Sequence, residues 1–177
     1  MTGSSPLRIA FGGSMQVGKT TAADWLVERH GFVKYALADS IKEIACRDFE
    51  WDGLKDDRGR RLLQEIGDVG RNYRPDLWLD RFAARLQADP ASRAVVDDVR
   101  LEREVRYLRD LGFVVALVVR PADRIATLPL QARRSHPTET GLEGVQLDVA
   151  VDNSGSFEAF YVRLDALVKS LEVAADG

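Results

Sequence analysis

The chain has 177 residues, of which 45% are hydrophobic and 30% charged, and its formal net charge is −3. These values are typical of one globular domain with a substantial core, and the acidic balance argues against a nucleic-acid partner. No apolar run is long enough to cross a membrane, and the single cysteine excludes an internal disulfide, so we expect a cytoplasmic protein with no membrane partner.

The first 30 residues predict a strand, a loop and a helix. Leu7–Phe11 is a short apolar run typical of a buried strand, and Thr21–Arg29 has apolar residues at helical spacing. Between them, Gly13–Thr20 matches the phosphate-binding loop pattern G-x-x-x-x-G-K-[ST] without a mismatch. Because the pattern requires this order of elements, the sequence predicts a P-loop protein that binds a nucleoside triphosphate.

Each fixed position of this loop has a physical role. The two glycines let successive amide N–H groups point into one concavity, and the following helix adds its positive end. Lys19 neutralises the β- and γ-phosphates, and the Thr20 hydroxyl is a ligand for Mg²⁺. The predicted triphosphate-binding residues are Gly13, Ser14, Gln16, Val17, Gly18, Lys19, Thr20 and Thr21.

The next part of the chain predicts a strand and three helices. Phe32–Leu37 has the composition of a strand, and helices are expected over Ser40–Phe49 and Gly59–Arg71. A third helix opens at Pro75, because proline is favoured in a first helical turn. We interpret residues 39–90 as a helical excursion from the core that holds the acceptor substrate.

The second half of the chain returns to alternating strands and helices. Strands are expected over Arg93–Arg100, Phe113–Val119 and Val145–Val151, and helices over Glu102–Leu111 and Ser156–Val173. This alternation predicts an α/β three-layer sandwich around a mainly parallel five-stranded sheet. The predicted organisation is a single P-loop domain over residues 1–177, with a core of 1–38, 91–120 and 145–177, the excursion and a lid over 120–144.

Chemistry-bearing residues follow several of these strands, where ligands bind in such folds. Asp97 and Asp98 end an apolar strand, which suits a carboxylate that supports Mg²⁺, although acids also cap helices and line solvated turns. Asp97 is assigned to the metal because it is closer to the strand. Asn153 follows the last strand and borders the adenine of a bound nucleotide, or else belongs to a turn over residues 152–155.

Arginines gather in and beside the predicted lid. The γ-phosphoryl group in transfer carries negative charge on its oxygens, and arginines on a closing lid stabilise it. We therefore predict Arg120 and Arg124, with Lys19, as catalytic residues, and Arg124, Arg133 and Arg134 as lid residues, against the alternative of a solvated basic loop.

Several segments, in order, resemble the deoxynucleoside monophosphate kinases of tailed bacteriophages, which are distantly related to the P-loop phosphomevalonate kinases. One departure follows Arg100, where relatives often carry Phe-Pro-Asn-Glu and this chain has Leu-Glu-Arg-Glu. The similar segments are the P-loop, Ala36–Ile44, Leu62–Arg71, Pro75–Trp78, Val95–Arg100 and His136–Thr140.

The resemblance implies phosphoryl transfer from ATP, with Mg²⁺, to a deoxynucleoside monophosphate. It also implies that the substrates are small-molecule nucleotides and that the protein forms a homodimer. If the protein is viral, we expect it in the cytoplasm of the host cell. The substrate-binding residues that we predict with it are Asp39, Lys42, Gln64, Arg71, Asp98 and Arg100.

Two alternatives stay open at this point. The first is a kinase for an alcohol acceptor, either a nucleoside or a hydroxymethylated base in DNA, with Asp39 as general base. The second is a nucleotide-dependent switch or assembly ATPase, which would hydrolyse slowly without an acceptor.

Overall fold

The computed structural model describes residues 6–88, 90–91, 93–120, 142 and 144–176. The chain forms two compact units. Unit 1 comprises Met1–Lys34 and Ala91–Gly177, and unit 2 comprises Tyr35–Pro90.

A five-stranded sheet organises unit 1. Its strands are β1 (Leu7–Gly12), β2 (Val33–Tyr35), β3 (Arg93–Val99), β4 (Val114–Val119) and β5 (Val149–Asp152). They lie in the order β2-β3-β1-β4-β5, and β1 pairs in parallel with both β3 and β4, as β4 does with β5. The loop that follows β1 therefore leaves the middle of the sheet, next to the ends of β3 and β4.

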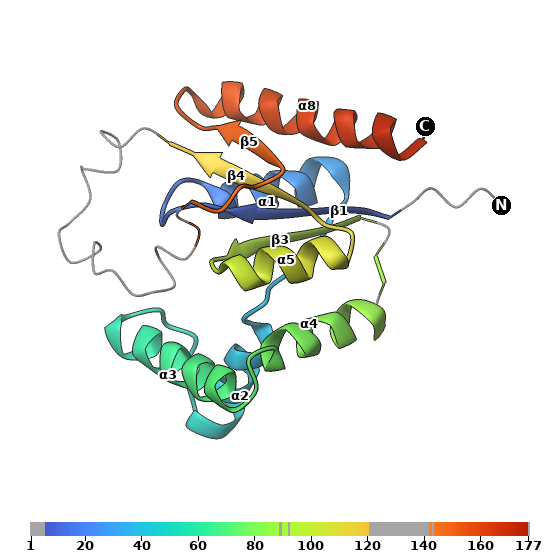
Figure 1. Ribbon diagram of the computed structural model, residues 1–177. Coiled ribbons are helices and arrows are strands. Elements are labelled where there is room, and N and C mark those ends of the chain that lie inside the picture. Colours follow the sequence, from blue (N-terminus) through green and yellow to red (C-terminus); the bar gives the residue numbers. More distant parts are fainter. Residues whose placement is uncertain (1–5, 89, 92, 121–141, 143, 177) are drawn as a thin grey trace. The chain divides into compact units, whose positions relative to one another are not determined.

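Helices cover both faces of this sheet (Figure 1). Helices α1 (Lys19–His30) and α8 (Phe157–Asp176) pack on one face, and α5 (Glu102–Asp110) lies on the other. On the α1 side, fully buried side chains from the strands and both helices form one apolar cluster, which includes Ile9, Phe11, Leu26, Phe160 and Leu164. The predicted three-layer α/β fold is confirmed.

Unit 2 is helical. It contains α2 (Asp39–Phe49), α3 (Asp57–Tyr73) and α4 (Leu77–Ala88). The stripe predicted for the last helix, Leu79, Phe82, Ala83 and Leu86, is buried, and Phe82 meets the ring of Tyr35 edge to face.

Some element boundaries differ from those that the sequence predicted. Pro75 does not open α4: it lies in a turn in which Leu77 N donates to Arg74 O, and the helix begins at Leu77. The strand predicted over Val145–Val151 is shorter and begins at Val149. Among the described residues, no helix has both the length and the hydropathy that crossing a bilayer requires.

Candidate active site

The loop between β1 and α1 curls around a small concavity. Its backbone φ is positive at Gly13, Gln16 and Gly18, at 136°, 62° and 107°. Residues that carry a side chain rarely adopt this backbone region, which explains why two of the three positions are glycines. A methyl group at Gly13 would also lie 2.7 Å from the carbonyl oxygen of Val118, so the loop packs closely on the end of β4.

The ammonium group of Lys19 lies inside this loop. Its Nζ donates to the carbonyl oxygens of Gly13, at 2.7 Å, and of Ser14, at 2.6 Å. Burial, assisted by the positive charge of Arg100 and opposed by two acids of β3, lowers the pKa of Lys19 from 10.5 to about 8. At neutral pH the group is still mostly protonated, so a cation held partly out of water faces the place that the motif assigns to phosphates.

The N-terminus of α1 is available to an anion. Among the described residues, no side chain caps this end of the helix at Gly18, and the first turn contains no acidic residue. The unpaired amide groups and the positive end of the helix dipole therefore favour a negatively charged ligand. Of the predicted triphosphate-binding residues, Ser14, Gln16 and Thr20 are exposed, whereas Val17 is buried.

A bulge in β3 brings two carboxylates toward the loop. Where β3 pairs with β1, the two residues Asp97 and Asp98 stand opposite the single residue Phe11. Such a bulge redirects side chains from the strict alternation of a strand. Both carboxylates act electrostatically on Lys19. Both acids lie near the end of β3, where the sequence placed them.

Lys34 on β2 holds one of these carboxylates, a contact that the sequence analysis missed. Its Nζ lies 2.9 Å from Asp97 Oδ2 and 2.9 Å from Asp24 Oδ1. Burial alone would lower the pKa of Lys34, but the bonds to Asp24 and Asp97 outweigh it and the pKa is raised. The Asp97 side chain is only 12% exposed, so its orientation is set by this ion pair.

The donors near the loop fit Mg²⁺ better than they fit a metal bound by protein alone. Among the described residues, no three His, Cys, Asp or Glu side chains form a cluster that could hold a metal ion. Mg²⁺ keeps water and phosphate oxygens among its ligands and needs only one or two protein oxygens. The Thr20 hydroxyl and the carboxylates of Asp97 and Asp98 are the described groups that suit this role.

Arg100 lies just after β3, and its backbone is fixed by a residue that the sequence analysis did not select. The Oε2 atom of Glu104 accepts from the amide of Arg100, at 2.6 Å, and from that of Leu101, at 3.0 Å. Glu104 is the last residue of the Leu-Glu-Arg-Glu segment that follows Arg100. It caps the start of α5 and fixes the backbone from which Arg100 reaches toward Lys19.

Arg120 follows β4, the strand whose end packs on the loop. Within the described part of the chain, its buried Nε has no hydrogen-bond partner, as is also true of Arg8 Nε, and a buried donor without a partner is costly. The other predicted lid residues, Arg124, Arg133 and Arg134, lie outside the described residues, as does the segment His136–Thr140.

Asn153 is buried beside the loop. Its side chain donates to the carbonyl oxygen of Val17 at 2.8 Å. The residue also belongs to the alternative that the sequence allowed, a turn, because Ser154 N donates to Asp152 Oδ1 at 3.0 Å. Both observations concern the protein's own contacts, and the adenine contact stays a prediction.

In unit 2, three charged residues meet at the start of α2. Asp39 and Lys42 were predicted from the sequence, and Arg85 comes from α4. Asp39 accepts from Lys42 Nζ at 3.0 Å and from the backbone amide of Ala36 at 3.1 Å, and Arg85 Nη1 lies 3.6 Å from its Oδ2. Arg85 also donates to Glu43. Sequence analysis missed Arg85, because it lies on another helix and belongs to no motif.

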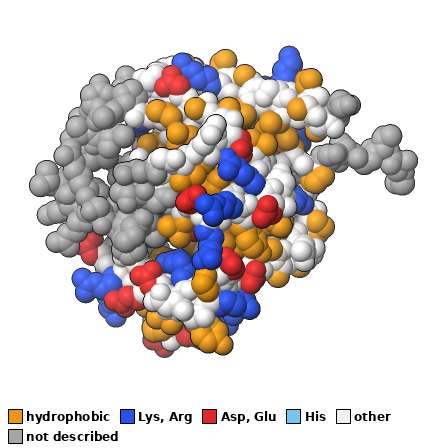
Figure 2. All heavy atoms as spheres, viewed as in Figure 1, with side chains coloured by type: hydrophobic (Ala, Val, Ile, Leu, Met, Phe, Trp, Pro, Cys, Tyr) orange, Lys and Arg blue, Asp and Glu red, His pale blue; other side chains and the backbone are white. Residues whose placement is uncertain are grey.

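Arg71 and Gln64 lie on α3. Arg71 donates to Asp68, one turn earlier, at 2.7 Å, and Gln64 is half-buried. Trp78 is buried, as the sequence favoured, and donates to the carbonyl oxygen of Gly67 at 2.9 Å. Figure 2 shows Lys and Arg side chains interspersed with Asp and Glu side chains on the visible face.

The chain is similar in sequence to a known protein family and to several viral proteins. The family model for deoxynucleotide monophosphate kinase matches residues 58–164, which is more than half of the chain. A protein of Acanthamoeba polyphaga mimivirus that carries the provisional name deoxynucleotide monophosphate kinase is 27% identical over 191 residues, covering 90% of this chain and 95% of that protein. The ORF76 protein of Ictalurid herpesvirus 1 is 29% identical over 170 residues, covering 94% and 68%.

The fold also matches solved kinase structures. The dephospho-CoA kinase of Campylobacter jejuni superposes with a TM-score of 0.58 at 15% identity, covering 94% of this chain and 98% of that chain. The fold is therefore that of the P-loop kinases, and the prediction of an enzyme that is a nucleoside monophosphate kinase is confirmed at the level of the family. The chain belongs to the deoxynucleotide monophosphate kinase family.

Proposed function

We propose that the protein transfers the γ-phosphoryl group of ATP to a deoxynucleoside monophosphate, giving ADP and a deoxynucleoside diphosphate. The observation that carries the proposal is the loop over residues 13–20, with the Lys19 ammonium inside it and an uncapped helix N-terminus behind it. Membership of the family supports a monophosphate as the acceptor.

The transfer needs positioning and charge more than proton removal. An oxygen of the acceptor phosphate attacks the γ-phosphorus, the bond from that phosphorus to the β–γ bridging oxygen breaks, and the electron pair remains on ADP. The attacking oxygen is already anionic near neutral pH, so no general base is required. We assign Lys19 and the amides of α1 to the β- and γ-phosphates, and Arg120 and Arg124 to the charge that develops on the group in transfer.

Mg²⁺, when bound, neutralises the β- and γ-phosphate oxygens. Thr20 supplies the hydroxyl ligand. Asp97 supplies the second protein group, in the orientation that its ion pair with Lys34 gives it.

On the acceptor side, we assign the monophosphate contacts to Lys42, Arg71 and Arg100, and the contact to the base to Gln64. Asp98 and Asp39 complete the predicted substrate-binding set. Asp39 is poorly placed to act as a general base, because both of its oxygens already accept from cations or from a backbone amide. A substrate hydroxyl would have to displace one of these donors, which favours a phosphate acceptor over an alcohol.

The proposal is tested with a panel of acceptors. Purified protein with ATP and Mg²⁺ is given each deoxynucleoside monophosphate, each ribonucleoside monophosphate, each nucleoside and hydroxymethylated duplex DNA, and the products are identified by mass. We expect ADP release coupled to a deoxynucleoside diphosphate. Turnover with only a nucleoside or DNA would replace the proposal by the alcohol-acceptor alternative, and slow hydrolysis that no acceptor stimulates would replace it by an ATPase.

Two further expectations belong to the proposal. A single catalytic domain that works as a homodimer is expected from the family resemblance, and light scattering on the purified protein measures its mass in solution. Limited proteolysis, followed by mass analysis of the fragments, tests whether residues 39–90 and 120–144 are separate from the core.

A further inference from the structure

Asn153 contacts the phosphate-binding loop from behind. Its side chain is 6% exposed, and its Nδ2 donates to the carbonyl oxygen of Val17 at 2.8 Å. The same residue's backbone amide donates to the carbonyl oxygen of Val119 at 2.7 Å. Asn153 is therefore fixed to the end of β4 on one side and to the loop on the other.

The amide also packs directly against the second glycine of the motif. A methyl group at Gly18 would lie 2.5 Å from Asn153 Nδ2, closer than any real contact of that kind. The glycine is thus required by a close approach as well as by its positive φ of 107°.

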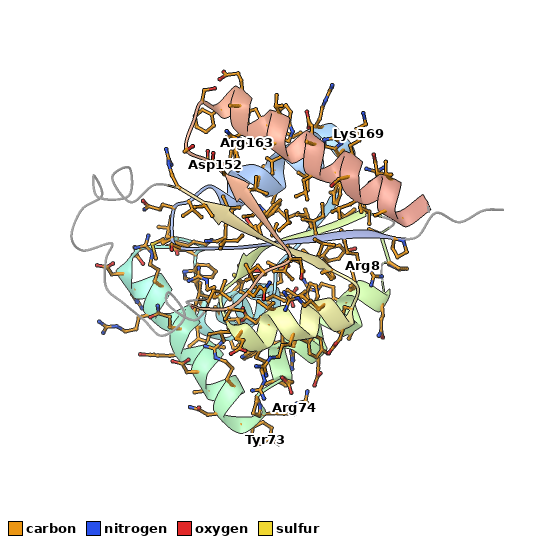
Figure 3. All side chains as sticks on the ribbon, turned by 45° about the horizontal axis from the view of Figure 1, so that its top comes forward. Arg8, Tyr73, Arg74, Asp152, Arg163 and Lys169 are labelled. Atoms are coloured by element: carbon orange, nitrogen blue, oxygen red, sulfur yellow. The ribbon has the colours of Figure 1, made fainter. Side chains whose placement is uncertain are left out.

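The turn that carries Asn153 is itself braced. Asp152 accepts from the amide of Ser154 at 3.0 Å and from its hydroxyl at 2.8 Å. Arg163 on α8 donates to the carbonyl oxygen of Asp152 at 2.9 Å and lies 3.2 Å from its carboxylate. Figure 3 shows Asp152 and Arg163 together where β5 passes into α8. Asn153 therefore projects from a turn that contacts on both sides hold in place.

We propose that Asn153 is a positioning residue for ATP, acting through the peptide bond between Val17 and Gly18. In a planar trans peptide the C=O and the N–H point in opposite directions. By holding Val17 C=O on the outer side of the loop, Asn153 turns Gly18 N–H toward the concavity, where an anion is bound. This inference rests on the proposed function, because it takes the loop to be the ATP site.

The test uses three variants and a binding measurement. Asn153→Ala removes the donor, Asn153→Asp replaces it with a carboxylate of the same shape, and Asn72→Asp alters the other asparagine of the chain, which is exposed on α3. Affinity for a non-hydrolysable ATP analogue with Mg²⁺ is measured by calorimetry from pH 5 to 8. Asn153→Ala should weaken binding about tenfold and Asn72→Asp less than twofold.

The pH profile separates positioning from a general structural role. At pH 8, Asn153→Asp should bind about a hundredfold more weakly than the wild type, because its carboxylate faces the Val17 carbonyl oxygen. Burial beside the Val17 carbonyl oxygen raises the pKa of the introduced carboxyl group above its ordinary value of about 3.9, so toward pH 5 the group becomes protonated and can donate again. The affinity relative to the wild type should therefore recover by about tenfold. Asn153→Ala should show no recovery. Wild-type affinity for Asn153→Asp at pH 8, or the same recovery in both variants, would overturn the proposal.

A second readout does not depend on ATP binding. In ligand-free protein, hydrogen exchange of the peptide that spans the loop should be faster in Asn153→Ala than in the wild type, with the exchange of α5 unchanged. If the wild type fails to bind the ATP analogue but the loop exchange differs as expected, the proposed function fails and the contact survives. If the analogue binds equally well to all variants and the loop exchange is unchanged, the positioning role fails alone.

Discussion

The two units hold their candidate functional groups by different means. In unit 1, the loop over residues 13–20 is shaped by its backbone, with positive φ angles, a buried contact from Asn153 and a lysine bonded to the loop's own carbonyl groups. In unit 2, the candidate groups are charged side chains that are oriented by ion pairs with their neighbours. These side chains are Asp39, Lys42, Arg71 and Arg85. A backbone-built site is specified by a few residue types at fixed spacing, whereas a side-chain network can be built in many ways.

This difference explains why the sequence predicts the proposed ATP site more readily than the proposed acceptor site. Phosphates look alike in every nucleotide, so one arrangement of amides and one lysine serves them all. Acceptors differ in their bases and sugars, so the residues that contact them have no common pattern. If the two units are as separate as this difference implies, a change in one unit should leave the binding properties of the other nearly unaltered.

Removing the loop lysine should have the largest effect. Lys19→Ala should lower kcat/KM by several orders of magnitude, because the γ-phosphate loses its main cation, while circular dichroism and the unfolding midpoint remain near those of the wild type. Steady-state kinetics measures this. A fall of less than about tenfold, or about 1.4 kcal/mol, would contradict the phosphate role of Lys19.

A single methyl group should destabilise unit 2. At Gly70, that group would lie 2.2 Å from Cζ2 of the buried Trp78, so Gly70→Ala should lower the free energy of unfolding by about 2–3 kcal/mol. Urea unfolding followed by tryptophan fluorescence measures the change. Val69→Ala is the control, because Val69 is exposed and its loss should cost less than about 0.5 kcal/mol. Affinity for the ATP analogue should remain within about twofold of the wild type, and a larger fall would show that the units are not independent.

Replacing Asp39 should have a moderate effect. Asp39→Asn keeps the shape and the hydrogen bond from Ala36 N but removes the charge that Lys42 and Arg85 share. We expect about a tenfold rise in KM for the monophosphate, with KM for ATP and kcat nearly unchanged. A thousandfold fall in kcat is the result that a general base would give.

Changing the pH should have the smallest effect. The pKa of Lys19 is lowered to about 8, so its charge is lost as the pH rises through that value, and affinity for the ATP analogue should fall about threefold between pH 7.5 and 8.5. Lys19→Arg should bind without this dependence, since a guanidinium group stays charged. An unchanged wild-type affinity over this range would contradict the assignment.

The same shift affects stability in the opposite direction. The unfolded chain binds the Lys19 proton more tightly than the native protein does, so the contribution of Lys19 to stability rises with pH between about 8 and 10.5 and is constant below about 8. Urea unfolding of the wild type and of Lys19→Ala across this range isolates the contribution, as the difference between the two curves.

Much of the fold was predictable because local patterns decide it. The apolar runs around Ile9 and Val115 are buried on both faces, and the stripe of α4 repeats at helical spacing. Boundaries were less predictable where a turn competes with a helix. At Pro75, the preceding Arg74 carbonyl accepts from Leu77, and this turn delays the helix by two residues.

The contacts within the candidate site were predictable only where the residues in contact are close in sequence. Lys34 meets Asp97, Arg85 meets Asp39, and Asn153 meets Val17, and each pair joins residues that are far apart along the chain. No repeating spacing of residues in the sequence predicts such contacts. The bulge at Asp97 and Asp98 is similar, since it depends on the pairing with β1 and not on β3 alone.

The contact of Gly70 with Trp78 has a consequence for how related chains can diverge. The indole of Trp78 occupies the space that a side chain at position 70 would need, so a substitution at one position constrains the residue at the other. A chain with alanine or serine at the first position should carry a smaller residue at the second, and neither substitution should persist for long without the other. Among diverging relatives, these two positions should therefore covary, even though they lie in separate helices joined by a turn.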